Sequence, residues 1–231
     1  MCAAQWSQMA GDPDTDARAR QQRHWAATFA ANADMYGTEP SEAAVAAAGQ
    51  FAANDQRRVL ELGPGQGRDT LFLAQRGFEV VAVDYAGGGL DTIAAKARGS
   101  DLTPRVSSIQ HDVRKALPFS DESFDASYSH MLFCMALTTR ELEHLANEVR
   151  RVIRPRGLVV YTVRHTGDAH YGSGTPHGDD MFEQGGFIVH FFDRHLVDRL
   201  ADGFELVDVT AFTEGELPRR LWQVTMRKSS A

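Results

Sequence analysis

Short apolar runs alternate with amphipathic segments along most of the chain. The predicted strands are 57–61, 79–83, 105–110, 124–129 and 158–163, and the helices between them are 68–76, 90–97 and 138–153. This alternation is typical of a parallel sheet with right-handed crossovers and helices on both faces. After a helix at 193–201, the last two runs, 204–212 and 221–227, are only about eight residues apart and must pair antiparallel. We therefore expect a doubly wound α/β fold, with a seven-stranded, mostly parallel sheet and an antiparallel last strand.

The chain divides into three parts. Residues 1–15 are polar and rich in aspartate, and we expect a flexible tail there. The segment 16–56 predicts two helices, and 57–231 forms the sheet domain. Within that domain, the glycine-rich stretch 165–191 is interpreted as a long flexible loop. Long loops in compact domains are usually lids or binding segments, so we predict a lid, with an ordinary solvated loop as the alternative.

Composition narrows the class of protein. The chain has 231 residues, 43% of them apolar, and a formal net charge of -7, which suits a folded domain and excludes a disordered chain. The two cysteines cannot form a disulfide framework, and no apolar run approaches the roughly 18 residues of a membrane span. Without a signal-peptide pattern, a cytoplasmic location is expected. Without a block of Lys and Arg, we expect neither nucleic acid nor a membrane as partner.

A glycine-rich loop follows the first predicted strand and precedes a helix. Glycine lets the backbone turn sharply and lets a ligand approach it closely, and such crevices bind ligands in open α/β sheets. A dinucleotide fingerprint would place its third glycine at position 68, but this residue is Arg68, which disfavours nicotinamide redox chemistry. Asp84 ends the second strand, where its carboxylate can accept hydrogen bonds from both hydroxyls of a ribose.

These features resemble class I S-adenosylmethionine-dependent methyltransferases. The resemblance rests on the motif E-x-G-x-G-x-G at 61–67, the acidic residue Asp84, His111-Asp112-Val113, Leu117-Pro118-Phe119 and the segment 149–157. Within this class, the chain looks most similar to bacterial tellurite-resistance and thiopurine-type methyltransferases. One departure is Gly87-Gly88-Gly89, an unusually flexible run where the family commonly starts a helix.

The resemblance implies S-adenosylmethionine as cofactor, a small-molecule methyl acceptor and no metal. The residues it implies for cofactor binding are Glu61, Gly63, Gly65, Gly67, Asp84, Tyr85, Asp112, Val113 and Ser129. Tyr85 would lie along the adenine with Asp112 and Val113 at its edge, and Ser129 would lie near the sulfonium. The alternatives are a half-buried surface aromatic for Tyr85 and a turn or helix-cap residue for Asp112. The two N-terminal helices would cover the cofactor.

His130 and His165 follow strands and are the candidate catalytic bases. Neither has an obvious carboxylate partner in the sequence, and an alcohol acceptor needs a well-oriented base. A thiol or chalcogen acceptor is anionic near neutral pH and needs only placement, so the sequence favours it. An O- or N-methyltransferase that uses a histidine base stays open, as does a non-catalytic module that binds S-adenosylmethionine. The oligomeric state is not predicted.

Two further features carry a metal or thiol hypothesis. Five histidines fall between positions 165 and 195, but their spacing fits no helical zinc pair, so no metal is expected. Cys134 follows the fourth strand in a Met- and Phe-rich segment. It is interpreted as a small buried hydrophobe, with a ligand for a soft element as the alternative.

Overall fold

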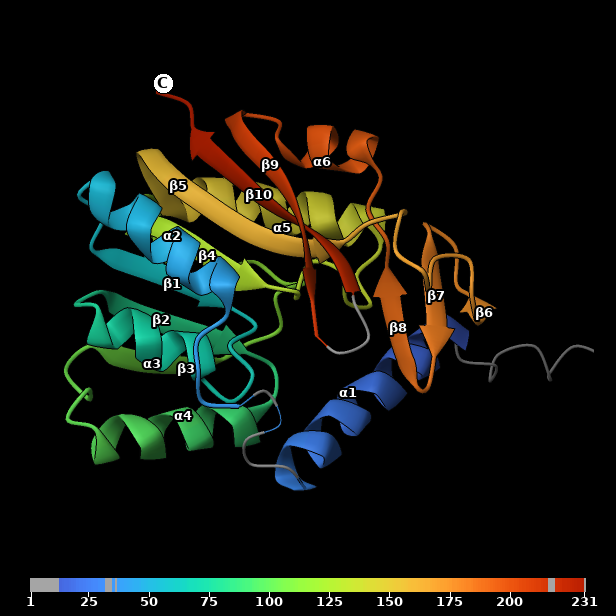
Figure 1. Ribbon diagram of the computed structural model, residues 1–231, viewed down its shortest axis with the longest axis horizontal. Helices are drawn as coiled ribbons and strands as arrows, with labels where there is room; N and C mark the ends of the chain where they lie inside the picture. Colours follow the sequence, from blue (N-terminus) through green and yellow to red (C-terminus); the bar gives the residue numbers. More distant parts are fainter. Residues whose placement is uncertain (1–12, 32–34, 36, 216–218, 231) are drawn as a thin grey trace, which may run out of the picture.

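The protein, described here from a computed structural model, is built around one seven-stranded sheet (Figure 1). The structure describes residues 13–31, 35, 37–215 and 219–230. The strands are β1 (Arg58–Leu62), β2 (Glu79–Asp84), β3 (Val106–Gln110), β4 (Phe124–His130), β5 (Ile153–Arg164), β9 (Phe204–Glu214) and β10 (Arg219–Lys228). Their order is β3-β2-β1-β4-β5-β10-β9, and β10 is antiparallel to both its neighbours. The predicted fold, including the antiparallel last strand, is confirmed.

Helices cover both faces of this sheet because its strand residues alternate between two cores. The helices are α1 (Pro13–Ala31), α2 (Glu42–Ala53), α3 (Arg68–Gln75), α4 (Gly87–Gly99), α5 (Thr139–Val152) and α6 (Arg194–Leu200). In β2, Val80 and Ala82 belong to the core clusters on the face of α2, α3 and α4, whereas Val81 and Val83 belong to the cluster on the face of α5 and α6. No described helix has the length and apolarity that a membrane crossing requires.

Several predicted boundaries are corrected by the structure. Residues 1–12 of the expected tail lie outside the described residues. Residues 13–15, also expected in the tail, belong to α1. Gly87-Gly88-Gly89 belong to the first turn of α4, so this helix begins three residues before the predicted start at position 90. The capping box of α5 is present, but this helix ends at Val152, one residue before the predicted end. Strand β5 starts at once with Ile153, five residues earlier than expected.

The stretch 165–191 is not one irregular loop. It contains a small antiparallel sheet made of β6 (Thr175–Pro176), β7 (Met181–Gln184) and β8 (Phe187–His190). Gly185 and Gly186 join β7 to β8 with φ angles of 61° and 84°, a backbone that favours glycine. A Gly-Gly pair between two apolar runs is a hairpin signal, which the interpretation as a loop overlooked.

Helix α1 lies against this small sheet (Figure 1). The side-chain amide of Gln21 mimics a neighbouring strand, because its Oε1 accepts from the Ile188 N–H at 3.0 Å and its Nε2 donates to the Ile188 carbonyl at 3.2 Å. The Phe187 ring packs on Trp25 with a centroid distance of 4.7 Å. Helix α1 and the small sheet, which are far apart in sequence, therefore pack against each other beside the large sheet.

Candidate active site

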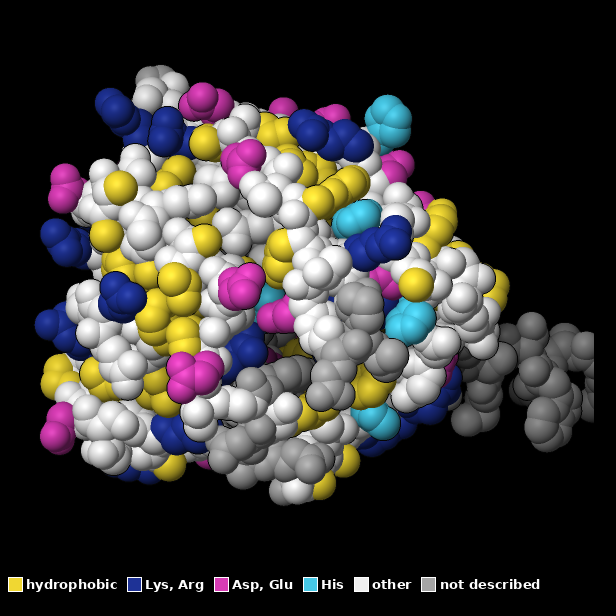
Figure 2. All heavy atoms as spheres, in the orientation of Figure 1, with side chains coloured by type: hydrophobic (Ala, Val, Ile, Leu, Met, Phe, Trp, Pro, Cys, Tyr) yellow, Lys and Arg dark blue, Asp and Glu magenta, His cyan; other side chains and the backbone are white. Residues whose placement is uncertain are grey.

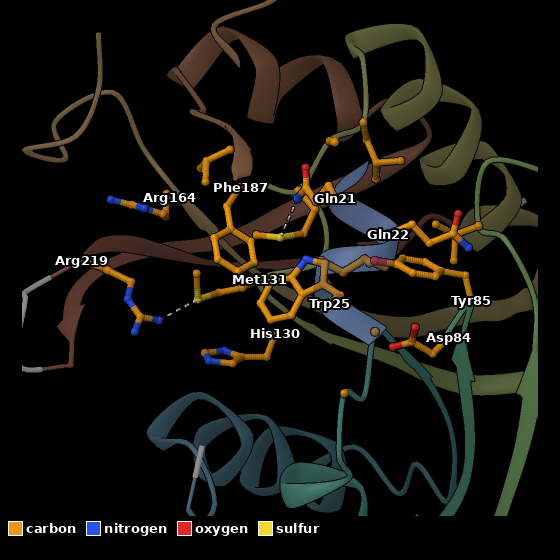
Figure 3. Close-up of a pocket in the computed structure, with 18 of the residues that line it drawn as sticks. Gln21, Gln22, Trp25, Asp84, Tyr85, His130, Met131, Arg164, Phe187 and Arg219 are labelled. Carbon is orange, nitrogen blue, oxygen red and sulfur yellow. Dashed lines mark hydrogen bonds between the residues drawn. The ribbon is translucent and has the colours of Figure 1, made fainter. Parts of the chain in front are cut away.

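A cavity of about 640 Å³ opens at the carboxyl ends of β1, β2 and β4. The strand order reverses between β1 and β4, which is where open α/β sheets bind ligands. The predicted site residues that line it are Glu61, Gly63, Gly65, Asp84, Tyr85, Asp112, Val113 and His130. Helix α1 and the small sheet form the opposite wall, with Trp25 and Phe187 reaching into the cavity (Figure 3). Eight predicted residues thus converge on one cavity.

The other three predicted residues do not line this cavity. Ser129 is buried inside the sheet, where its hydroxyl donates to the Leu62 carbonyl at 3.0 Å. Gly67 precedes α3, and a Cβ there would lie 2.4 Å from Cγ1 of Ile93, so this glycine serves helix packing. His165 stacks on Trp222 with ring centroids 4.6 Å apart, and it is not retained as a candidate base.

Two acidic side chains mark one end of the cavity. Burial raises the pKa of Asp84 to about 6, and its Oδ1 accepts from the Ala86 N–H at 2.9 Å. Burial raises the pKa of Glu61 to about 8. Glu61 is 2% exposed, and its Oε2 has no hydrogen-bond partner among the described residues. A buried acceptor without a donor costs about 1–3 kcal/mol, which a cationic or N–H-bearing ligand would recover.

This end fits S-adenosylmethionine. The cofactor carries an ammonium group and a sulfonium, both suited to a carboxylate-lined cavity, and its ribose offers two hydroxyl donors to Asp84. Gly63 and Gly65 have φ angles of 72° and 57°, so the loop adopts a backbone that side chains disfavour. A Cβ on Gly63 would also lie 2.8 Å from Cβ of Leu132. The glycines therefore keep the loop close to the sheet and its surface free of side chains.

Tyr85 and Asp112 lie beside Asp84 at this end. Tyr85 is partly buried and lines the cavity, and its carbonyl accepts from the side chain of Gln110 at 2.9 Å. Asp112 both lines the cavity and holds a turn, because its Oδ1 accepts from the Arg114 N–H at 3.0 Å. Although burial acts to raise it, hydrogen bonds from Arg114 hold the pKa of Asp112 below its usual value. The turn interpretation of Asp112 is thus correct alongside its place in the cavity.

His130 marks the other end and has the carboxylate partner that the sequence did not show. Its Nε2 lies 3.2 Å from Oε2 of Glu214, and its Nδ1 lies 2.9 Å from Oγ1 of Thr162. Thr162 also accepts from the Met131 N–H at 3.0 Å. The hydrogen bond with His130 lowers the pKa of Glu214. The expectation that neither histidine has an orienting carboxylate is therefore wrong for His130.

Cys134 is the small buried hydrophobe that the sequence suggested. It is fully buried, its thiol donates to the Met131 carbonyl at 3.3 Å, and burial raises its pKa to about 11. A protonated thiol outside the cavity wall is a poor ligand for a soft element. Among the described residues, no group of His, Cys, Asp or Glu is arranged to hold a metal ion.

Several residues of the cavity were not among the predicted site residues. They are Gln21, Gln22, Trp25, Arg68, Arg114, Arg164, Phe187, Glu214 and Arg219. Most come from α1, the small sheet and the β9–β10 hairpin, which only the tertiary fold brings to the strand ends. On the face shown in Figure 2, basic and acidic side chains are interspersed and do not form a continuous basic patch.

Part of the chain is similar in sequence to known methyltransferases. Residues 59–157 match a family model described as a methyltransferase domain. A demethylmenaquinone methyltransferase of Clavibacter sepedonicus is 35% identical over 104 residues, which are 45% of this chain and 39% of that protein. The chain spans about half or less of the length of the curated relatives it matches.

Solved structures share the fold across most of the chain. The Burkholderia thailandensis 1,6-didemethyltoxoflavin-N1-methyltransferase, solved with that compound and S-adenosylhomocysteine, superposes with a TM-score of 0.74 at 17% identity. The match covers 95% of this chain and 92% of that one. TehB from Haemophilus influenzae has a TM-score of 0.62 at 16% identity, over 80% of this chain and 61% of that one. The comparisons therefore show similarity to a methyltransferase domain over residues 59–157 and a fold shared with methyltransferase structures across most of the chain.

Proposed function

We propose that the protein transfers the methyl group of S-adenosylmethionine to an oxygen or nitrogen of a small molecule. The observation that carries this proposal is the His130–Glu214 pair at the cavity end opposite Asp84 and Tyr85. A neutral acceptor must lose a proton as it attacks, and a histidine paired with a carboxylate is suited to receive it. The sequence favoured a thiol acceptor because no oriented base was apparent in it, and the His130–Glu214 pair is a candidate for that base.

The cofactor supplies an activated methyl group on a sulfonium, and the chain's own residues bind and orient the reactants. Asp84 would accept from the ribose hydroxyls, and Glu61 would face the ammonium group. Tyr85, Asp112 and Val113 would surround the adenine. The wall formed by α1 and the small sheet would shield the methyl group from water. Placement of the acceptor in line with the bond from sulfur to the methyl group would supply most of the catalysis.

In this proposal, each segment of the chain has a separate role in binding or catalysis. Of the helices expected to cover the cofactor in 16–56, α1 takes this role, whereas α2 packs on the sheet and does not line the cavity. The segment 57–231 forms the catalytic domain, and 165–191 closes the cavity as a lid. The contacts of Gln21 with Ile188 and of Trp25 with Phe187 support this division, because they join α1 to β8 over the cavity.

A thiol or chalcogen acceptor, in the manner of tellurite-resistance and thiopurine-type methyltransferases, is the second candidate. Met131, next to His130 in the chain, and Met135, beside Gln21, line the cavity and would desolvate a soft anion. The fold shared with TehB is compatible with it. The 1,6-didemethyltoxoflavin enzyme, whose name states an N1-methyltransferase, gives the corresponding fold-level support for nitrogen.

One set of measurements separates these candidates. Calorimetry with S-adenosylmethionine tests the cofactor, and transfer of radiolabelled methyl to phenols, amines, thiols, selenite and tellurite tests the acceptor. We expect turnover of a phenol or amine to fall at least about 100-fold in His130→Ala and to persist in His165→Ala. Thiol turnover indifferent to His130→Ala would favour the second candidate. Cofactor binding without transfer to any acceptor would favour a non-catalytic binding module.

A further inference from the structure

The cavity contains one arginine that forms no ion pair within 4 Å among the described residues, although its charge helps to lower the pKa of Glu214. Four arginines line the cavity, and three of them are paired with neighbouring carboxylates. These pairs are Arg68 with Asp69 at 3.1 Å, Arg114 with Asp112 at 2.8 Å and Arg164 with Asp168 at 2.5 Å. The fourth is Arg219, whose Nη1 donates to the sulfur of Met131 at 3.7 Å. A partly buried guanidinium in contact with a thioether is poorly satisfied.

The obvious partner for Arg219 is already engaged. Glu214 lies directly opposite Arg219 in the β9–β10 hairpin, but its carboxylate is hydrogen-bonded to His130. The guanidinium of Arg219 therefore faces the cavity beside Met131 and the His130–Glu214 pair (Figure 3). This end of the cavity therefore holds a planar guanidinium, hydrogen-bonded to a thioether and not to a carboxylate, next to the candidate base.

The space between Arg219 and the cofactor end is walled by aromatic side chains. Trp25 and Phe187 lie between Arg219 and Tyr85 in the cavity (Figure 3). Phe182 and Phe191 add to the same wall from the small sheet and its exit. Flat, apolar molecules pack well against such rings, while a guanidinium binds a carboxylate through two parallel hydrogen bonds.

We infer that Arg219 binds a carboxylate of the methyl acceptor, and that the acceptor is a small aromatic acid. This inference rests on the methyl transfer proposed above and names the substrate class of the same site. The ring lies against Trp25 and Phe187, the carboxylate pairs with Arg219, and the methylated group points toward His130. Arg219 fixes the orientation of the acceptor and takes no part in proton transfer.

Matched acids and amides test this assignment. Calorimetry on protein saturated with S-adenosylhomocysteine compares 2- and 4-hydroxybenzoate with 2- and 4-hydroxybenzamide, which differ only in the charged group. The wild type is expected to bind at least one acid at least about tenfold more tightly than its amide. Arg219→Gln should reduce this preference to within about twofold. Arg220→Gln, which changes an exposed neighbour that does not line the cavity, should keep it.

Each outcome has a defined meaning. A preference that is absent in the wild type, survives in Arg219→Gln or disappears equally in Arg220→Gln overturns the inference, as does a lack of binding by both acids. Failure of the wild type to bind S-adenosylhomocysteine would instead refute the proposed function, so the two failures are distinguishable. Arg219→Lys adds a further check, because a retained charge without the planar fork should recover only part of the preference.

Discussion

Replacing Glu61 by glutamine tests the buried carboxyl at the cofactor end through protein stability. Burial raises the pKa of Glu61 from 4.5 to about 8, so the folded chain keeps this group protonated where the unfolded chain ionises it. The stability that the protonated group contributes is therefore present below pH 4.5 and is lost as the pH rises toward 8. Glutamine has nearly the same shape and no titration.

The expected size follows from the two pKa values. Between pH 5 and pH 7, ionisation of the unfolded chain costs the wild type about 2–3 kcal/mol relative to Glu61→Gln. Urea unfolding of both proteins at the two pH values measures this difference, and other titrating groups cancel because they are common to both. A stability difference between variant and wild type that is the same at both pH values would refute the assignment of Glu61 as a strained, buried acid.

The same variant is expected to affect stability and cofactor affinity in opposite directions. Loss of the carboxylate should weaken S-adenosylmethionine binding about tenfold at pH 8, because the ammonium group loses its charged partner. Glu205→Gln is the matched control, since Glu205 is exposed on β9 and does not line the cavity. It should alter neither the pH dependence of stability nor the affinity for the cofactor.

Three further changes have defined outcomes. Asp84→Ala should weaken S-adenosylmethionine binding at least about tenfold by calorimetry, through loss of charge-assisted bonds to the ribose; unchanged affinity would remove Asp84 from the site. Gly67→Ala should cost about 1–3 kcal/mol in urea unfolding, because its φ is 83° and its Cβ would collide with Ile93; Gly88→Ala, in a helix with open space around it, should cost nothing. Gln21→Ala should speed protease cleavage within 165–191, since it removes both hydrogen bonds to Ile188; equal cleavage rates would show that α1 does not hold the small sheet.

The fold was predictable because its signals are local. Strands β1, β2 and β4 are each followed by a helix, and the capping box at Thr138 marks the start of α5 within one residue. The cofactor end shares this property, because Glu61, Gly65 and Asp84 lie at strand ends in the order of the chain. Strand ends of a parallel sheet meet at one edge, so a sequence pattern alone brings these residues together.

The small sheet was not predicted because the composition of its segment is typical of a flexible loop. The segment 165–191 is so rich in glycine, histidine and polar residues that a flexible loop was the simpler interpretation. Its order comes from partners elsewhere, since Ile188 is held by Gln21 and Phe187 packs on Trp25. The Gly185-Gly186 pair signals the hairpin, but the helix that holds it, more than 150 residues away in sequence, leaves no trace in the pattern of this segment.

The acceptor end depends on the register of the β9–β10 hairpin. Leu221 pairs with Arg164, the last residue of β5, so Arg219 and its partner Glu214 extend two residues beyond the end of that strand. The extension carries the Glu214 carboxylate to His130, 84 residues away in sequence, and aims Arg219 into the same cavity. The sequence spacing does not indicate how many residues of a hairpin extend beyond the end of the neighbouring strand. The absence of a nearby carboxylate in sequence was therefore no evidence against a histidine base, and the preference for a thiol acceptor that rested on it loses its main support.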